Sequence, residues 1–282
     1  LAAPDRPLAA AAETAADASR ALLRALSAAV RVRVRCAPAP APGAARAAVM
    51  FSGGLDSMVL ARLADAHLPP AEPIDLLNVA FGAGAAAAPD RLAALCGVRE
   101  LRRTSARAWR LVLIDVSLDE LAAARAQLEV LLAPAATVMD VNIGAALWFG
   151  ARGRGTLRTR LGAAPPPSAD LRYAADGDGN GDGDALEDDI VDDDEAGVPQ
   201  REYPSDDESC AEGALDGREY RSAARVLLLG MGADEQMGGY GRHRTAYRKG
   251  GAEALRRELA ADCERMWLRN LGRDDRVLSD WG

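Results

Sequence analysis

One glycine-rich loop, placed directly after a short apolar run, constrains what this chain can fold into. Residues 47–51 read A-A-V-M-F, and residues 52–57 read S-G-G-L-D-S. The apolar positions of the helical pattern that follows are Met58, Leu60, Ala61, Leu63 and Ala64. This order predicts a buried strand, a tight loop and the start of a helix.

The chemistry of the loop predicts a site for phosphate and magnesium. Gly53 and Gly54 lack a Cβ, so backbone N–H groups can approach an anion closely, and a helix N-terminus favours negative charge. Ser52 and Ser57 add hydroxyl donors. Asp56 would repel a bare phosphate, so its presence indicates a bridging Mg²⁺. A Walker A loop is excluded because no lysine follows the second glycine. The alternative is a Gly-Gly turn that binds no ligand.

A second stretch, near the end of the chain, repeats this design. Residues 225–229 read R-V-L-L-L, as in a buried strand, and residues 230–240 read G-M-G-A-D-E-Q-M-G-G-Y. Asp234 can share a metal ion with Asp56 if the two turns meet. Taken alone, this stretch could be a helix C-cap and a cluster of turns. Two glycine-rich turns at the carboxyl ends of parallel strands define a ligand crevice in an open α/β sheet.

The segments around these turns alternate between strand and helix patterns. We expect strands at residues 74–81 and 110–116, the second with the continuous apolar character of a sheet covered on both faces. Residues 30–35, V-R-V-R-V-R, are strand-like in isolation but could equally be the basic end of a helix. The expected helices begin at Ser19, Pro89, Ser117 and Thr137. The pattern predicts an α/β fold with a mainly parallel, doubly wound sheet.

Charge is distributed unevenly along the chain. The net charge is −8, but residues 176–212 alone contain 16 acidic residues and one basic residue. We expect residues 163–221 to form an acidic, low-complexity insert outside the fold. The flanking residues 49–162 and 222–282 would then form one domain, preceded by an alanine-rich lead, residues 1–48, with a helix and a proline-rich linker.

Several other classes of function find little support in the sequence. Residues 176–187 match the EF-hand expression, but Gly183 occupies a position that is normally apolar and no second loop follows, so we expect no calcium site. Outside residues 176–212 the net charge is +7, too weak and unclustered to indicate nucleic-acid binding. We also expect no membrane span. Four scattered cysteines predict reduced thiols and a cytoplasmic protein.

The two turns together resemble a known family. S-G-G-L-D-S resembles the loop of the PP-loop ATP pyrophosphatases, which cleave ATP between its α and β phosphates. Combined with G-x-G-A-D-E-x-x-G-G-Y at residues 230–240, it resembles the synthetase domain of the asparagine synthetases. Residues 270–277, N-L-G-R-D-D-R-V, are similar to that family's L-x-R-D-D-R segment. Within that family, the sequence is most similar to the asparagine synthetase domain-containing subgroup, over residues 19–162 and 222–282.

This resemblance implies a PP-loop fold and an ATP-dependent amide ligase. ATP, with Mg²⁺, would activate the aspartate side-chain carboxylate as β-aspartyl-AMP and release pyrophosphate. Ammonia or glutamine-derived nitrogen would then give asparagine. The residues that the resemblance assigns to catalysis are Asp56, Asp234 and Glu235, with Asp56 and Asp234 as metal ligands. Those it places around pyrophosphate are Ser52, Gly53, Gly54, Asp56 and Ser57. Those it places around adenosine are Met50, Phe51, Val79, Leu229 and Gly230.

The chain departs from the family at three points. Met231 stands where the family usually has a glutamate that faces the substrate. The family's glutaminase domain, with its N-terminal cysteine, is missing from this chain. Its later R-x-P-F-L-D stretch and reactive-phosphate lysine are missing too, and we expect both ends to be incomplete. A non-catalytic relative that acts as a binding or assembly protein is therefore an alternative. A further alternative is another PP-loop adenylating enzyme, such as a tRNA thiolase or an NAD synthetase. The sequence of the second turn argues against it.

Two charged clusters near the end of the chain admit two interpretations each. His243 and its neighbours Arg242 and Arg244 could contact phosphate, but a solvated basic turn is the preferred interpretation. The other cluster is Arg273, Asp274 and Asp275. It would reach the crevice if the tail folds back, and would otherwise be an exposed charged turn.

Overall fold

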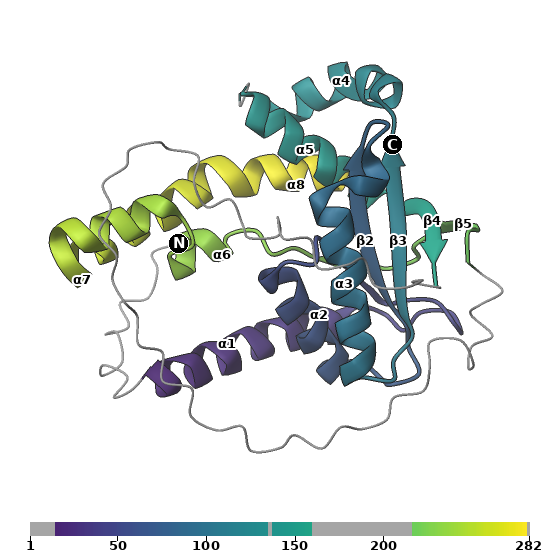
Figure 1. Cartoon of the computed structure of the whole chain (residues 1–282), viewed down its shortest axis with the longest axis horizontal. Coiled ribbons are helices and arrows are strands. Elements are labelled where there is room, and N and C mark those ends of the chain that lie inside the picture. The colour runs from purple at the N-terminus through teal and green to yellow at the C-terminus, as the bar shows by residue number, and fades with distance from the viewer. Residues whose placement is uncertain (1–14, 135–136, 160–215, 281–282) are drawn as a thin grey trace.

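A six-stranded, mostly parallel sheet forms the centre of the molecule. The computed structural model describes residues 15–134, 137–159 and 216–280, drawn in colour in Figure 1. The strands are β1 (Ala47–Met50), β2 (Ile74–Phe81), β3 (Trp109–Val116), β4 (Arg154–Arg158), β5 (Glu219–Arg221) and β6 (Val226–Leu228). They lie in the order β5-β4-β3-β2-β1-β6. Strands β6, β1, β2 and β3 pair in parallel, and β4 pairs antiparallel with both β3 and β5. The predicted α/β class is confirmed, whereas the PP-loop type stays a prediction.

Helices cover both faces of this sheet, because alternate side chains of each parallel strand point to opposite faces. One face, with Val49 and Leu76, packs against α1 (Ala15–Cys36), α2 (Leu55–His67) and α3 (Pro89–Thr104). The other face, with Ala48 and Leu77, lies toward α4 (Leu118–Leu132), α5 (Val138–Ala151) and α8 (Leu271–Ser279). In Figure 1, α4, α5 and α8 lie above α1, α2 and α3. The doubly wound arrangement predicted from the sequence is therefore present.

The remaining elements connect β6 to the last helix. They are α6 (Ala233–Met237), α7 (Gly241–Arg265) and a π-helical turn, η3 (Met266–Asn270). Elsewhere in the chain, a short 3₁₀ turn, η1 (Ala85–Ala87), precedes α3. In Figure 1, α7 lies at the end of the molecule opposite to β4 and β5. Within the described ranges, no helix combines the length and the apolar character needed to cross a membrane.

The alternating V-R-V-R-V-R stretch is the end of helix α1, which settles the choice left open by the sequence. Val30 and Val34 are four residues apart and lie fully buried in the core. Arg31, Arg33 and Arg35 remain exposed. Residues four apart lie on the same face of a helix, so this burial pattern fits a helix end packed against α2.

The sequence did not predict β4 and β5, which close one edge of the sheet. Their antiparallel pairing continues that of β3 and β4. Strand β5 occupies the last three residues of the range 163–221 that was expected to be an insert. The domain boundaries otherwise stay a prediction. The EF-hand-like match at residues 176–187 lies outside the described residues.

Candidate functional site

A cavity of about 1010 Å³ lies at the carboxyl ends of β1, β2 and β6. The chain runs from β1 to β2 and β3 on one side, while β6 pairs with β1 on the other. The strand order therefore reverses beside β1. In open α/β sheets this is the place where connections diverge and leave a crevice for a ligand.

The S-G-G-L-D-S loop forms one wall of the cavity. Gly53 has a φ of +81°, and a Cβ at this position would lie 2.2 Å from the backbone carbonyl carbon of Ala93. Only glycine fits such a turn. The Ser57 hydroxyl donates to the Gly54 carbonyl at 2.9 Å, and Gly54 N–H donates to Ser52 Oγ at 3.3 Å. Helix α2 starts at once, without a side-chain cap, so its first N–H groups can serve a ligand.

The second turn packs directly against the first. A Cβ at Gly230 would lie 3.0 Å from Asp56 Cβ, so the two turns touch where each strand ends. The backbone N–H groups of Gly238 and Gly239 both donate to the Asp234 carbonyl, at 3.0 and 3.1 Å. Burial, and next the nearby charge of Asp234, raises the pKa of the Asp56 carboxyl. The structure thus brings together two carboxylates that are far apart in the sequence.

This pair of carboxylates suits a magnesium ion held jointly with phosphate. Within the described ranges, no group of three or more His, Cys, Asp or Glu side chains is arranged to hold a metal ion. Mg²⁺ in nucleotide sites commonly uses one or two carboxylates, with phosphate oxygens and water completing its coordination. A cation would also offset the burial and the nearby charge of Asp234, which together raise the pKa of Asp56. Asp56 and Asp234 therefore fit the group as donors.

Glu235 lies in the cavity wall with its carboxylate held from two sides. Its Oε1 accepts from the Tyr240 hydroxyl at 2.9 Å and from Asn270 Nδ2 at 3.4 Å. Burial, and next the hydrogen bond to Glu235, raises the pKa of Tyr240 to about 12. Tyr240 therefore remains a proton donor to this carboxylate at neutral pH.

The opposite wall is built from side-chain ion pairs that the sequence did not predict. Arg273, only 5% exposed, donates to Asp140 at 2.5 Å and to Asp274 at 2.8 Å. The hydrogen bond from Thr137, together with Arg273, lowers the pKa of Asp140 despite partial burial. Burial raises the pKa of Asp274, and Arg273 counteracts this. Of the cluster Arg273, Asp274 and Asp275, Arg273 lines the cavity, Asp274 is buried beside it and Asp275 is exposed. Nothing in the sequence around Asp140 indicates more than a helix start.

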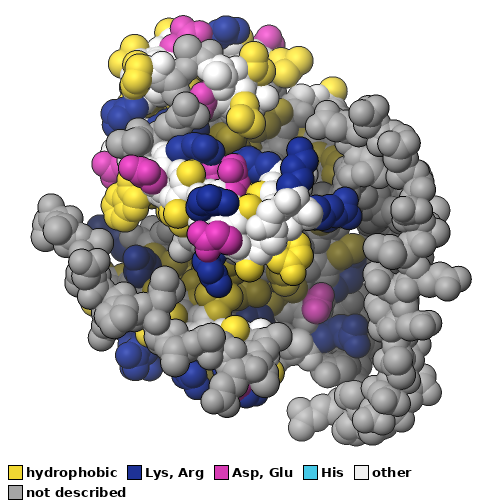
Figure 2. Space-filling view, turned by 90° about the vertical axis from the view of Figure 1, so that its left-hand side faces the viewer, with side chains coloured by type: hydrophobic (Ala, Val, Ile, Leu, Met, Phe, Trp, Pro, Cys, Tyr) yellow, Lys and Arg dark blue, Asp and Glu magenta, His cyan; other side chains and the backbone are white. Residues whose placement is uncertain are grey.

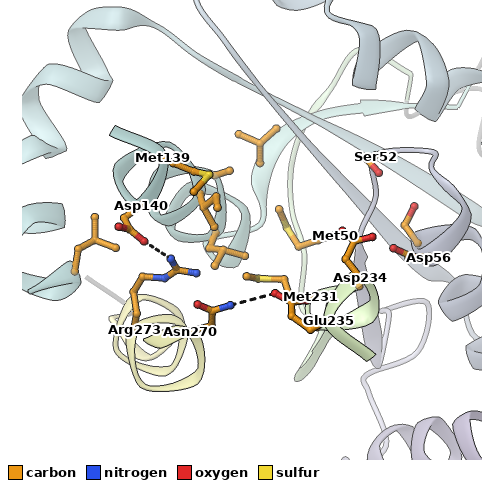
Figure 3. A pocket seen from close by; sticks show the side chains of 18 of the residues that line it. Met50, Ser52, Asp56, Met139, Asp140, Met231, Asp234, Glu235, Asn270 and Arg273 are labelled. Atoms are coloured by element: carbon orange, nitrogen blue, oxygen red, sulfur yellow. Dashed lines mark hydrogen bonds and ion pairs between the residues drawn. The ribbon is translucent and has the colours of Figure 1, made fainter. Parts of the chain in front are cut away.

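Methionine side chains separate these two walls. Met50, Met139 and Met231 all line the cavity. Figure 3 shows Met231 between the Asp56–Asp234 side and the Asp140–Arg273 side. Met231 is 39% exposed, so its thioether faces the cavity rather than the core. A thioether can fill space but cannot exchange a proton or hold a cation tightly.

A second group missed by the sequence analysis surrounds Asn78 in the middle of β2. Asn78 Nδ2 donates to the Phe51 carbonyl at 2.8 Å, and Arg91 donates to Asn78 Oδ1 at 2.6 Å. Arg91 also pairs with Asp115 on β3, at 2.6 Å. This network links the residue after β1, the middle of β2 and Asp115 of β3, and Asn78 itself lines the cavity.

Most residues expected to form the site do lie on the cavity. Those that line it are Met50, Phe51, Ser52, Asp56, Ser57, Val79, Gly230, Asp234 and Glu235. Gly53 and Gly54 shape the loop from behind, and Leu229 packs in the core beside α5. The Phe51 side chain is buried in the α2–α3 core, so only its backbone can reach a ligand. The roles predicted for these residues stay predictions.

The preferred interpretation of His243 as part of a solvated turn is wrong. Its side chain is 1% exposed, and its Nε2 lies 2.7 Å from Asp262 Oδ2. Non-helical backbone at Gly250 and Gly251 kinks α7 and lets its second half fold back beside its first. This long-range contact, absent from any local pattern, buries the imidazole.

The fold and the cavity define an α/β protein with a charged crevice where its strand order reverses. No family model matches the chain. Mouse (Mus musculus) asparagine synthetase domain-containing protein 1 is 35% identical over 276 residues, covering 84% of this chain and 35% of that protein. The human (Homo sapiens) protein of that name is 34% identical over 280 residues, with the same coverage of both chains. The chain belongs to the asparagine synthetase domain family.

The matched relatives are much longer than the region they share with this chain, which spans 35% of the length of the mouse and human proteins. One shorter match has a higher sequence identity. A putative glutamine-hydrolyzing asparagine synthetase 1 of Methanocaldococcus jannaschii is 49% identical over 51 residues, which is 18% of this chain and 9% of that protein.

Proposed function

We propose that this chain carries the ATP-binding domain of an asparagine-synthetase-like amide ligase. One observation carries the proposal. The two glycine-rich turns follow neighbouring parallel strands, and Gly230 packs against Asp56 at one end of the cavity. The names of the relatives agree with it, since they describe asparagine synthetase domains and, for the shorter match, a putative asparagine synthetase.

In the proposed reaction, the aspartate side-chain carboxylate attacks the α-phosphorus of ATP. The bond from the α-phosphorus to the oxygen that bridges to the β-phosphorus breaks, and pyrophosphate leaves with that oxygen. Ammonia, free or derived from glutamine, then attacks the carbonyl carbon of β-aspartyl-AMP. The carbon–oxygen bond to AMP breaks, the nitrogen loses a proton, and asparagine is formed.

The residues of the cavity divide this work between them. Backbone N–H groups of the 52–57 loop and of the first turn of α2 would bind the leaving pyrophosphate. Asp56 and Asp234 would hold Mg²⁺, which would neutralise charge on the phosphates. Met50 and Val79, together with the backbone of Phe51, Leu229 and Gly230, would surround the adenosine. Glu235, fixed by Tyr240 and Asn270, would orient the attacking nitrogen. A cytoplasmic location stays a prediction.

A second candidate function is a non-catalytic binding or assembly protein that keeps this fold. Met231 favours it, because its thioether faces the cavity where the asparagine synthetases that the chain resembles usually have a glutamate. A cavity with this substitution could still bind ATP through the loop wall. The two candidates therefore differ in chemistry, not in nucleotide binding.

Aspartate-dependent exchange of labelled pyrophosphate into ATP tests the first candidate. We expect exchange that requires aspartate and Mg²⁺ and that is lost in Asp56→Ala. Binding of ATP should be measured on the same samples by calorimetry. Absence of exchange with ATP binding retained would favour the non-catalytic candidate. Absence of both would contradict the nucleotide site itself.

A further inference from the structure

The β4–β5 edge of the sheet carries an exposed cluster of arginines, far from the cavity-forming end of β6. Strand β5 is the outermost strand on this side. The members of the cluster, here called the arginine edge, are Arg154, Arg158, Arg218 and Arg221, all exposed. Arg154 and Arg221 lie directly opposite each other in the antiparallel pairing. Like charges opposite each other destabilise a sheet, so this arrangement calls for negative charge nearby.

The described part of the chain supplies only part of that charge. Glu219 of β5 lies opposite Thr156, and Asp216 accepts a hydrogen bond from Thr159. The ion pairs among the described residues include none of these four arginines. The α7 end of the molecule differs in this respect. There, Arg242 and Arg265 both pair with Asp262, at 2.5 and 2.6 Å. Figure 2, which faces that end, accordingly shows basic and acidic side chains side by side.

The chain leaves the sheet and returns to it at this same edge. Thr159 N–H donates to Asp216 Oδ1 at 2.7 Å, and Leu157 N–H donates to the Arg218 carbonyl at 2.9 Å. Both ends of residues 160–215 are therefore held side by side at the arginine edge. The acidic segment, residues 176–212, lies within this range and contains 16 acidic residues and one basic residue.

Chain length keeps the acidic segment close to the arginines. Glu212 precedes Asp216 by four residues, and four residues of extended chain span at most about 14 Å. The carboxylates nearest to that end of the segment therefore cannot leave the neighbourhood of β5. Because the segment is tethered at both ends, its effective concentration at the arginine edge is in about the millimolar range.

We propose that the acidic segment, residues 176–212, docks on the arginine edge of its own chain. The segment then occupies the place that a nucleic acid or another external polyanion could otherwise take. Individual exposed ion pairs contribute little, so docking depends on the number of charges and weakens as salt screens them. This inference does not depend on the proposed ligase activity.

Chemical modification of arginines in the full chain tests the proposal. Phenylglyoxal is applied at low salt, and the rate at each arginine is read by mass spectrometry. The reference is a full-length variant in which the 16 acidic residues of the segment are replaced by Asn or Gln. Arg24 and Arg31 of α1 are exposed and serve as internal controls within the same molecule. They report any general effect of the altered net charge.

We expect the arginine edge to react about five-fold more slowly in the native chain than in the reference variant, as for an edge that is covered about four-fifths of the time. Arg24 and Arg31 should react equally in both chains. Salt of about 1 M should remove the protection in the native chain. This measurement does not need the variant.

Two outcomes would overturn the proposal. Equal reaction rates in both chains at the arginine edge would mean that the acidic segment does not cover it. Protection of the arginine edge only after addition of heparin, to the same degree in both chains, would identify an external polyanion as the occupant instead.

Discussion

The two walls of the cavity are built in different ways. The wall of the two turns is shaped by backbone, with Gly53 at a φ of +81° and Gly230 in contact with Asp56. The opposite wall depends on side chains, since Arg273 pairs with an aspartate 133 positions earlier in the chain. The first wall can be recognised from short motifs, whereas the second exists only once α5 and α8 have packed together.

The two walls also differ in how they treat negative charge. Burial, and next the nearby charge of Asp234, raises the pKa of Asp56, whereas the hydrogen bond from Thr137 and the charge of Arg273 lower the pKa of Asp140. One wall therefore holds carboxylates that a cation would stabilise, and the other holds a carboxylate already neutralised by arginine. Under the proposed function, the metal ion and its phosphate ligand would therefore bind at the first wall. The difference also predicts opposite effects of matching substitutions.

The largest effect is expected from Gly53→Ala in the first wall. The new Cβ would meet the Ala93 backbone at 2.2 Å and would also require a left-handed φ. We expect a loss of about 4 kcal/mol in the free energy of unfolding, measured by chemical denaturation. Gly43→Ala is the matched control, because Gly43 has a φ of +77° but nothing within 4 Å of the added atom. That control should lose only about 1 kcal/mol. Equal losses in both variants would contradict the close contact.

The next effect concerns the second wall, through Arg273→Met. The substitution leaves Asp274 buried without its arginine, so we expect a loss of about 3 kcal/mol in the free energy of unfolding. Asp140→Asn should be less harmful in this background than in the native chain, because the two side chains form one ion pair. A double-mutant cycle by denaturation measures this coupling. Strict additivity of the two changes would argue against the pair.

A smaller effect on stability is expected from Gly230→Ala, where the two turns meet. The added Cβ would lie 3.0 Å from Asp56 Cβ, at a position without a left-handed φ. We expect a loss of about 1 kcal/mol in stability, with a clear weakening of Mg·ATP binding by calorimetry because Asp56 is displaced. Gly217→Ala, remote from the cavity and with nothing within 4 Å, should leave Mg·ATP binding unchanged. Unchanged nucleotide affinity in Gly230→Ala would separate the second turn from the proposed site.

The smallest effect, and the one of opposite sign, is expected from Asp56→Asn. The folded state raises the pKa of Asp56 above its usual value near 3.8. The stability contributed by Asp56 is therefore present below that value and is lost as pH rises through the higher folded pKa. At pH 7 the substitution should stabilise the fold by about 0.5 kcal/mol after solvent screening, and the gain should vanish near pH 3. It should also abolish Mg·ATP binding.

Asp140→Asn is the matched control for the direction of the stability change, since the folded state lowers the pKa of Asp140. Its contribution is present above the usual pKa and is lost as pH falls through the folded value. The substitution should therefore destabilise the fold at pH 7, and increasingly less as pH falls. Denaturation across pH 3 to 7 follows both variants, and effects of equal sign would contradict the comparison of the two walls.

Local sequence patterns were sufficient for most of the sheet and for the first wall. The apolar run before S-G-G-L-D-S predicted β1, and the continuous apolar run at residues 110–116 predicted β3, because strands covered on both faces lack alternation. The short strands β4 and β5 gave no comparable signal. Strand β4 reads R-G-T-L-R with a single buried apolar residue, Leu157, and β5 reads E-Y-R and is only three residues long. Strand β4 forms because β3 offers it a partner, and β5 forms because β4 then offers it one.

By itself, the sequence determined the two glycine-rich turns, the strands they follow and the family to which the chain belongs. Each of these depends on residues within about a dozen positions of one another, where backbone freedom and apolar burial act locally. Only the tertiary structure decided that Asp140 pairs with Arg273, that His243 is buried beside Asp262, and that V-R-V-R-V-R ends a helix. These depend on contacts between segments whose separation in the chain carries no periodic signal, so packing alone selects them.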